Sequence, residues 1–185
     1  MQSCAVMEKL EQYHQMNQVA RPGGIVFFGS TYASRLPLGE MNQDFAMDQP
    51  VYNRSVETLS VQEAEAAVQN CVIELQPSRV FLMLGDADLE REDFIPEAFL
   101  ESYRWLLYTL HNRCDAVLYI VSALSDAPGV YQVNRMLEEL SAETGCTYVN
   151  VHTSCGLLQP VQRLLAVIRA YIHGTCIHFV QAMEL

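Results

Sequence analysis

The segment "GGIVFFGSTYAS", residues 23–34, decides how this 185-residue chain is expected to begin its fold. Its centre, Ile25 to Phe28, is a short continuous apolar run. Such runs are typical of a strand whose two faces are both covered by helices. Gly29 ends the run, and the hydroxyl residues Ser30 and Thr31 follow directly. The segment therefore predicts a buried first strand and a loop placed where an α/β enzyme would keep its nucleophile.

Short apolar strands and amphipathic helices alternate along the rest of the chain. The expected helices cover residues 4–19, 61–75, a segment opened by Pro96, residues 131–144 and residues 161–172. The expected later strands cover residues 50–55, 79–84, 116–124 and 146–151. This alternation indicates an α/β fold with three layers, in which a parallel sheet of about five strands lies between helices. We predict one domain over residues 1–185, and the tail at 173–185 fits either an edge strand or an ordered extension.

Composition and charge narrow the classes of partner. Half of the residues are hydrophobic, and 22 acidic against 11 basic residues give a formal net charge of -11. A nucleic acid would be repelled by such a surface, so we expect no nucleic-acid partner. No stretch approaches the ~20 apolar residues that span a bilayer, and the N-terminal residues lack a basic segment followed by an apolar one. We therefore expect a cytoplasmic protein without membrane insertion.

The six cysteines do not suggest a metal site. They form no C-x-x-C pair and no cysteine–histidine cluster at zinc spacing, and we interpret most of them as reduced thiols that pack as small hydrophobes. Cys155, beside a glycine, is the one cysteine for which we leave another role open. The acidic run from Asp86 to Asp93 is interpreted as a solvated loop rather than a site for a divalent cation. No metal and no cofactor is predicted.

Further segments carry a resemblance to a known family. "VYNRSVET" (51–58), "LQPSRVFLMLGDADL" (75–89), "AVLYIVSAL" (116–124) and "NRMLEELSAETGCTYVNV" (134–151) follow the first segment in order. Together these blocks resemble the SGNH (GDSL-like) hydrolases, a lipase and acylhydrolase family, and particularly the branch similar to platelet-activating-factor acetylhydrolase. The resemblance extends from the N-terminal helix to Val151. It implies a flavodoxin-like fold and a serine ester hydrolase activity.

The sequence departs from the family pattern in its first two blocks. The family's first block reads Gly-Asp-Ser, with the serine as nucleophile; here Gly29 matches, Ser30 replaces the aspartate and Thr31 replaces the serine. The second block usually ends in a glycine whose N–H belongs to the oxyanion hole, and Ser55 stands in its place. The hydroxyl of Ser30 or Thr31 is also suited to cap the turn that follows.

The later blocks depart further. Gly85 and Asp88 match the third block, but Ala87 replaces the asparagine that donates a hydrogen bond to the oxyanion. One lost donor of this kind typically costs on the order of a hundred- to a thousandfold in turnover. The final Asp-x-x-His, which would supply the base, has no counterpart, since no aspartate follows Asp126.

Two hypotheses therefore stand, and the enzyme question stays open between them. The first is a protein that has lost ester hydrolysis and binds a small ligand or a protein partner. Its expected pocket is lined by Gly29, Ser30, Thr31, Ser55, Gly85 and Ala87, beside Asp88. The alternative is an active esterase with a rewired site, in which Ser30 or Thr31 attacks and His152, after the fifth strand, acts as the base.

Overall fold

A parallel sheet of five strands forms the centre of the protein. The computed structural model describes residues 4–39, 49–152 and 167–172. The strands are β1 (Ile25–Gly29), β2 (Val51–Asn53), β3 (Arg79–Met83), β4 (Val117–Val121) and β5 (Thr147–Val149). Their order across the sheet is β2-β1-β3-β4-β5, with all pairs parallel. This is the flavodoxin-like order, so the predicted α/β architecture is confirmed.

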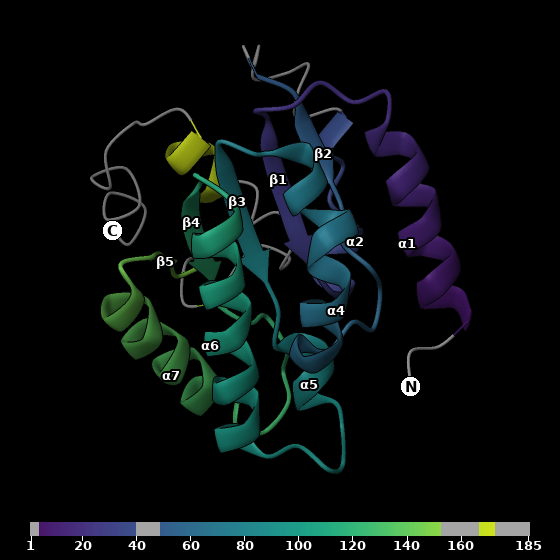
Figure 1. The fold of residues 1–185 in the computed structure, drawn as a ribbon. Coiled ribbons are helices and arrows are strands. Elements are labelled where there is room, and N and C mark those ends of the chain that lie inside the picture. Colours follow the sequence, from purple (N-terminus) through teal and green to yellow (C-terminus); the bar gives the residue numbers. More distant parts are fainter. Residues whose placement is uncertain (1–3, 40–48, 153–166, 173–185) are drawn as a thin grey trace.

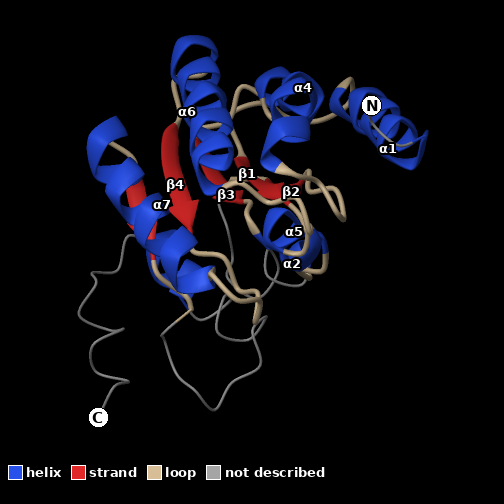
Figure 2. Ribbon diagram, turned by 90° about the horizontal axis from the view of Figure 1, so that it is seen from below, coloured by secondary structure: helices blue, strands red, loops and turns tan. Residues whose placement is uncertain are grey.

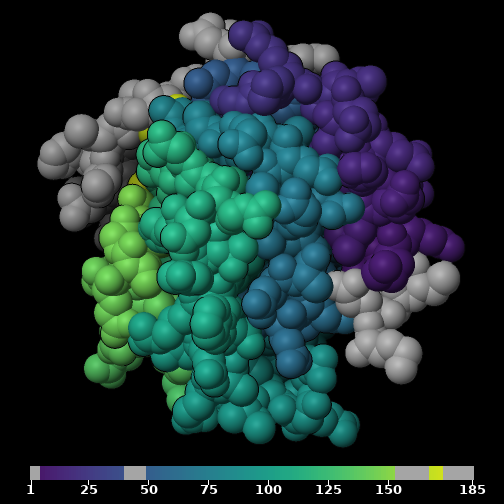
Figure 3. Space-filling view, viewed as in Figure 1, coloured from purple at the N-terminus to yellow at the C-terminus, as the bar shows by residue number. Residues whose placement is uncertain are grey.

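Helices cover both faces of the sheet (Figures 1 and 2). One face carries α1 (Cys4–Asn17), α4 (Val61–Cys71), α6 (Pro96–Arg113) and α7 (Val130–Thr144). Figure 3 shows these helices side by side as one continuous surface. The other face carries α2 (Thr31–Ser34) and the helical residues 167–172. A further short helix, α5 (Asp86–Leu89), follows β3 and packs against α2. The result is the three-layer arrangement expected from the sequence.

The apolar run of β1 is explained by its place between the two layers. Val26 and Phe28 belong to the core beneath α4 and α6, whereas Ile25 and Phe27 belong to the core beneath α2. All four side chains are completely buried. On the α2 face an aromatic row crosses three strands, because Phe27 stacks on Phe81 at 4.8 Å and Phe81 stacks on Tyr119 at 4.5 Å between ring centroids. A strand buried on both faces needs no polar alternation.

Gly29 ends β1 where its backbone lies close against that of Met83 in β3. A Cβ atom placed on Gly29 would lie 2.2 Å from the carbonyl oxygen of Met83, which no real side chain tolerates. The next residue uses this proximity, since the N–H of Ser30 donates to the Met83 carbonyl at 3.1 Å. Glycine at this position therefore follows from the packing of the two strands.

Several predicted elements are shorter than expected. The helix predicted over 61–75 ends at Cys71 and is followed by the 3-10 turn η1 (Ile73–Leu75). The strand predicted over 116–124 ends at Val121. The Ser122 N–H still donates to the Val149 carbonyl of β5 at 3.0 Å, but the N–H groups of the next three residues bond to side chains. The N–H of Ala123, for example, donates to the Asn134 side chain at 2.7 Å.

Some expectations concern parts of the chain outside the described residues. The helix predicted over 161–172 is described only at 167–172, where it is helical. Residues 173–185 and Cys155 lie outside the described residues. In the part of the chain that the structure does describe, none of the helices combines the length and the apolar character needed to cross a membrane.

Candidate functional site

Three loops meet at the carboxyl ends of β1, β2 and β3. The Ser30 N–H bonds the last residue of β3, and the Val56 N–H donates to the Gly29 carbonyl at 3.0 Å. The short helices that follow β1 and β3, α2 and α5, are in contact. In a sheet of this order the strand sequence reverses between β1 and β3, which is where ligands of open α/β proteins bind. The first three blocks therefore converge on one edge of the sheet.

Ser30 is enclosed in the protein. Its side chain is 0% exposed, and among the described residues its hydroxyl has no hydrogen-bond partner. Ser30 occupies the N-cap position of α2, but its side chain makes no capping bond, so the capping role predicted for it is wrong. The hydroxyl is buried rather than directed at the free N–H groups of the helix. Thr31, the first residue of α2, is half-buried and more accessible.

Ser55, at the second block, is held by internal hydrogen bonds. Its N–H donates to Asn53 Oδ1 at 3.0 Å, and its hydroxyl donates to the Phe27 carbonyl at 3.4 Å. Its carbonyl accepts a bond from the Tyr13 hydroxyl at 2.6 Å, and burial raises the pKa of Tyr13 to about 12. Ser55 is only 2% exposed. The N–H that the resemblance assigns to an oxyanion hole is therefore already bonded to the Asn53 side chain inside the protein.

The third block places an alanine beside a structural carboxylate. Gly85, the N-cap residue of α5, has a φ of 120°, a conformation that favours glycine. Ala87 is 8% exposed and carries no donor. Asp86 Oδ1 accepts bonds from the N–H groups of Leu124 and Ser125 at 2.7 and 2.8 Å. Asp86 thus ties α5 to the loop after β4.

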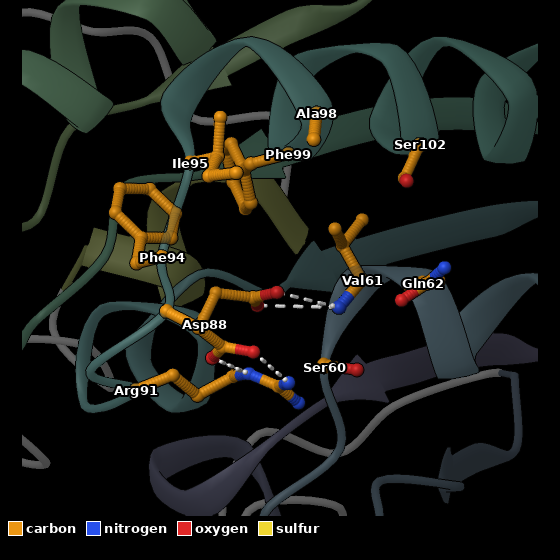
Figure 4. Close-up of a pocket in the computed structure, with 11 residues that line it drawn as sticks. Ser60, Val61, Gln62, Asp88, Arg91, Phe94, Ile95, Ala98, Phe99 and Ser102 are labelled. Atoms are coloured by element: carbon orange, nitrogen blue, oxygen red, sulfur yellow. Dashed lines mark hydrogen bonds and ion pairs between the residues drawn. The ribbon is translucent and has the colours of Figure 1, made fainter. Parts of the chain in front are cut away.

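Asp88 ties α5 to another element. Its two carboxylate oxygens accept from the Val61 N–H, at the start of α4, at 3.0 and 3.2 Å (Figure 4). Burial raises the pKa of Asp86 and of Asp88 to about 6, although the backbone hydrogen bonds act in the opposite direction. The prediction of a solvated acidic loop is therefore wrong for these two residues, because both carboxylates are buried and bonded to backbone. Within the described ranges, no group of three histidine, cysteine or acidic side chains could hold a metal ion.

His152 follows β5 at the edge of the sheet. Three strand positions separate β5 from β1, which at a spacing of ~4.8 Å amounts to about 14 Å across the sheet. The imidazole lies edge-on against the Tyr131 ring of α7, with 4.9 Å between ring centroids. Its backbone N–H donates to the Ser122 hydroxyl at 3.1 Å. The imidazole contact is with α7, on the face of the sheet opposite α2.

Comparison with known proteins rests on structure alone. The sequence matches no family model and no curated protein. A GDSL-like lipase from Bacteroides thetaiotaomicron superposes with a TM-score of 0.74 at 15% identity, over 90% of this chain and 98% of that chain. A lipase/acylhydrolase from Enterococcus faecalis gives 0.70 at 13% identity, over 82% and 96%.

A protein from Streptococcus pneumonia, described provisionally as a platelet activating factor, gives a TM-score of 0.78 at 14% identity, over 91% and 92% of the two chains. The chain has the GDSL-like hydrolase fold. The fold implied by the sequence resemblance is thus confirmed, and at these identities the likeness concerns the fold.

Two cavities lined by described residues do not coincide with the predicted pocket. One of about 470 Å³ lies between α1, α2 and the loop after β2, and Ser55 is among its lining residues. Another of about 230 Å³ has Asp88 in its wall. Neither cavity includes Ser30, Thr31 or Ala87. The structure brings the predicted residues to one edge of the sheet but buries most of them.

Two residues at the carboxyl edge of the sheet were not among the predicted site residues. Asn53 donates to the Ala33 carbonyl at 2.8 Å and accepts from Ser55, so it joins β2 to α2. An asparagine two residues before the N–H it binds is a known turn pattern, and this signal was present in the sequence. Tyr32 is the other: burial raises its pKa, and the nearby carboxylates of Asp86, Asp126 and Glu90 raise it further. Arg35 acts in the opposite direction on Tyr32.

Proposed function

We propose that this protein binds a small ligand or a protein partner at the carboxyl edge of its sheet and does not hydrolyse esters. The observation that carries the proposal is the third block. Ala87 has no group to donate there, and its neighbours Asp86 and Asp88 are bonded to backbone N–H groups. No side chain of this block is free to donate a hydrogen bond to an oxyanion or to transfer a proton.

The remaining blocks support the same conclusion. A missing oxyanion donor costs on the order of a hundred- to a thousandfold in turnover, and the Ser55 N–H is also engaged. Thr31 offers a β-branched hydroxyl, which is stiff and needs a base to activate it. Between Glu143 and Glu184 the sequence has no carboxylate that could orient His152. The machinery of a serine hydrolase is incomplete at each step.

One observation favours the alternative of a rewired esterase. Thr31 is half-buried at the start of α2, whereas Ser30 and Ser55 are fully buried. Of these three residues, Thr31 is the most exposed. If this protein is an esterase, Thr31 is the residue on which its activity depends.

Turnover of p-nitrophenyl acetate separates the two functions. We expect the natural chain, Thr31→Ala and Ser30→Ala to show the same slow rate, because no hydroxyl is activated. Ser34→Ala is the matched control, since Ser34 lies in the same helix and its hydroxyl donates to the Thr31 carbonyl. Activity that disappears in Thr31→Ala or Ser30→Ala but persists in Ser34→Ala would contradict the proposal.

A restored variant tests the missing base independently. Thr31→Ser combined with Ala87→Asn returns the nucleophile and the oxyanion donor of the family pattern. We expect turnover to stay at the level of the natural chain, because the base is still absent. An increase of tenfold or more would reveal a functional base and favour the esterase.

A further inference from the structure

A separate cavity of about 230 Å³ opens between the start of α4, α5 and the start of α6 (Figure 4). The catalytic positions of the GDSL-like pattern do not line it, apart from Asp88. Its lining includes two carboxylates, a guanidinium, two phenyl rings and small hydroxyl groups. The cavity therefore has a polar and an apolar part.

The polar part includes the carboxylate of Asp88, which is only 6% exposed. Its hydrogen bonds come from backbone N–H groups, chiefly that of Val61, which its two oxygens share. A carboxylate has about four acceptor sites, so acceptor capacity remains. Arg91 and Asp93 also line the cavity, and the Arg91 guanidinium is bound by Asp93 through two hydrogen bonds of 2.9 and 3.0 Å. The charge around the cavity is therefore negative, and Glu63 adds to it.

The apolar part comes from the start of α6 and the segment before it. Phe94 and Phe99 meet edge to face, with 5.7 Å between ring centroids. Ala98 and Val61 extend this wall, and Ser102 lies on the same helix. Figure 4 shows Asp88 between Phe94 and Val61, with the alkyl and aromatic groups around it. An occupant would thus meet a carboxylate at one end and hydrocarbon at the other.

We propose that this cavity binds a small primary ammonium compound with a short alkyl stem. The ammonium group donates hydrogen bonds to Asp88, and the stem lies against Phe94 and Phe99, whose rings also attract a cation. A metal ion is a poorer fit, because most of the wall has no ligand atoms. A quaternary ammonium lacks the N–H donors that the free acceptor sites of Asp88 require.

Titration with n-butylammonium chloride tests the proposal, with the backbone amide of Val61 observed by NMR. We expect a saturable shift of that amide with n-butylammonium. The neutral analogue 1-butanol and the quaternary tetramethylammonium ion should each bind at least tenfold more weakly. Equal binding of 1-butanol, or a shift that never saturates, would overturn the proposal.

Variants locate the binding in the cavity. Ala98→Leu fills it without removing a hydrogen bond and should weaken n-butylammonium at least tenfold, as should Asp88→Asn. Ala142→Leu is the matched control on an exposed position of α7 and should bind within about twofold of the natural chain. Unchanged affinity in Ala98→Leu would overturn the proposal, even if Asp88→Asn fails to fold.

Discussion

At single positions, the hydrogen-bond partners of the site residues show better than the residue types which groups are free for chemistry. Ser55 and Asn53 are polar residues at a predicted active edge, yet they bond to each other and to backbone. Ser30 keeps a hydroxyl at the expected place but buries it without a partner among the described residues. These residues hold the loops of the edge in place, and the contacts leave few groups free for chemistry.

Gly29 gives a prediction about packing. Gly29→Ala should lower the free energy of unfolding by about 2 to 3 kcal/mol, because the new methyl group would force β1 away from the Met83 carbonyl. Urea unfolding measures the difference. Gly39→Ala is the control, since a Cβ there meets no atom within 4 Å. Equal stability of the two variants would show that β1 and β3 do not approach each other as closely at Gly29 as inferred.

Among the elements, α5 is the junction of the site. Four residues long, it holds the loop after β4 through Asp86 and the start of α4 through Asp88. It also touches α2, the helix that carries Thr31. The protonation state of Asp86 and Asp88 therefore affects three elements around the predicted site.

This junction predicts an unusual dependence of stability on pH. The pKa of Asp86 and of Asp88 is raised from 3.8 to about 6 in the folded protein. Between these values the folded chain binds protons that the unfolded chain has released, so stability should rise as the pH falls from 7 toward 4. Each carboxyl contributes on the order of 1 to 3 kcal/mol, fully present below the unfolded pKa and lost above about pH 6.

Urea unfolding of single variants at several pH values measures this contribution. Asp86→Asn and Asp88→Asn should each flatten the rise in stability between pH 7 and pH 4. Asp93→Asn should keep the slope of the natural chain, because the pKa of the exposed Asp93 is lowered by its bond to Arg91. If the slopes of the Asp86 and Asp88 variants match that of the natural chain, these carboxyls do not titrate as inferred.

For the molecule as a whole, the sequence pattern was sufficient to predict the architecture. Continuous apolar runs and helical periodicity predicted five parallel strands between helices, and the GDSL-like fold agrees. The pattern did not predict where the helix beginning at Val61 ends, nor that Asp86 and Asp88 are buried. Those features depend on tertiary hydrogen bonds such as Asp88 to Val61, which join residues far apart in sequence. A run of acidic residues carries no local signal of such partners.

Loss of the activated nucleophile is tested most directly by a fluorophosphonate, which forms a covalent bond with the activated serine of a serine hydrolase. Intact-mass measurement of the treated protein shows whether a bond has formed, and peptide mapping shows where. We predict a mass unchanged from that of the untreated chain. A single adduct located on Thr31 or Ser30, and absent from the corresponding alanine variant, would contradict the proposal that this protein does not hydrolyse esters.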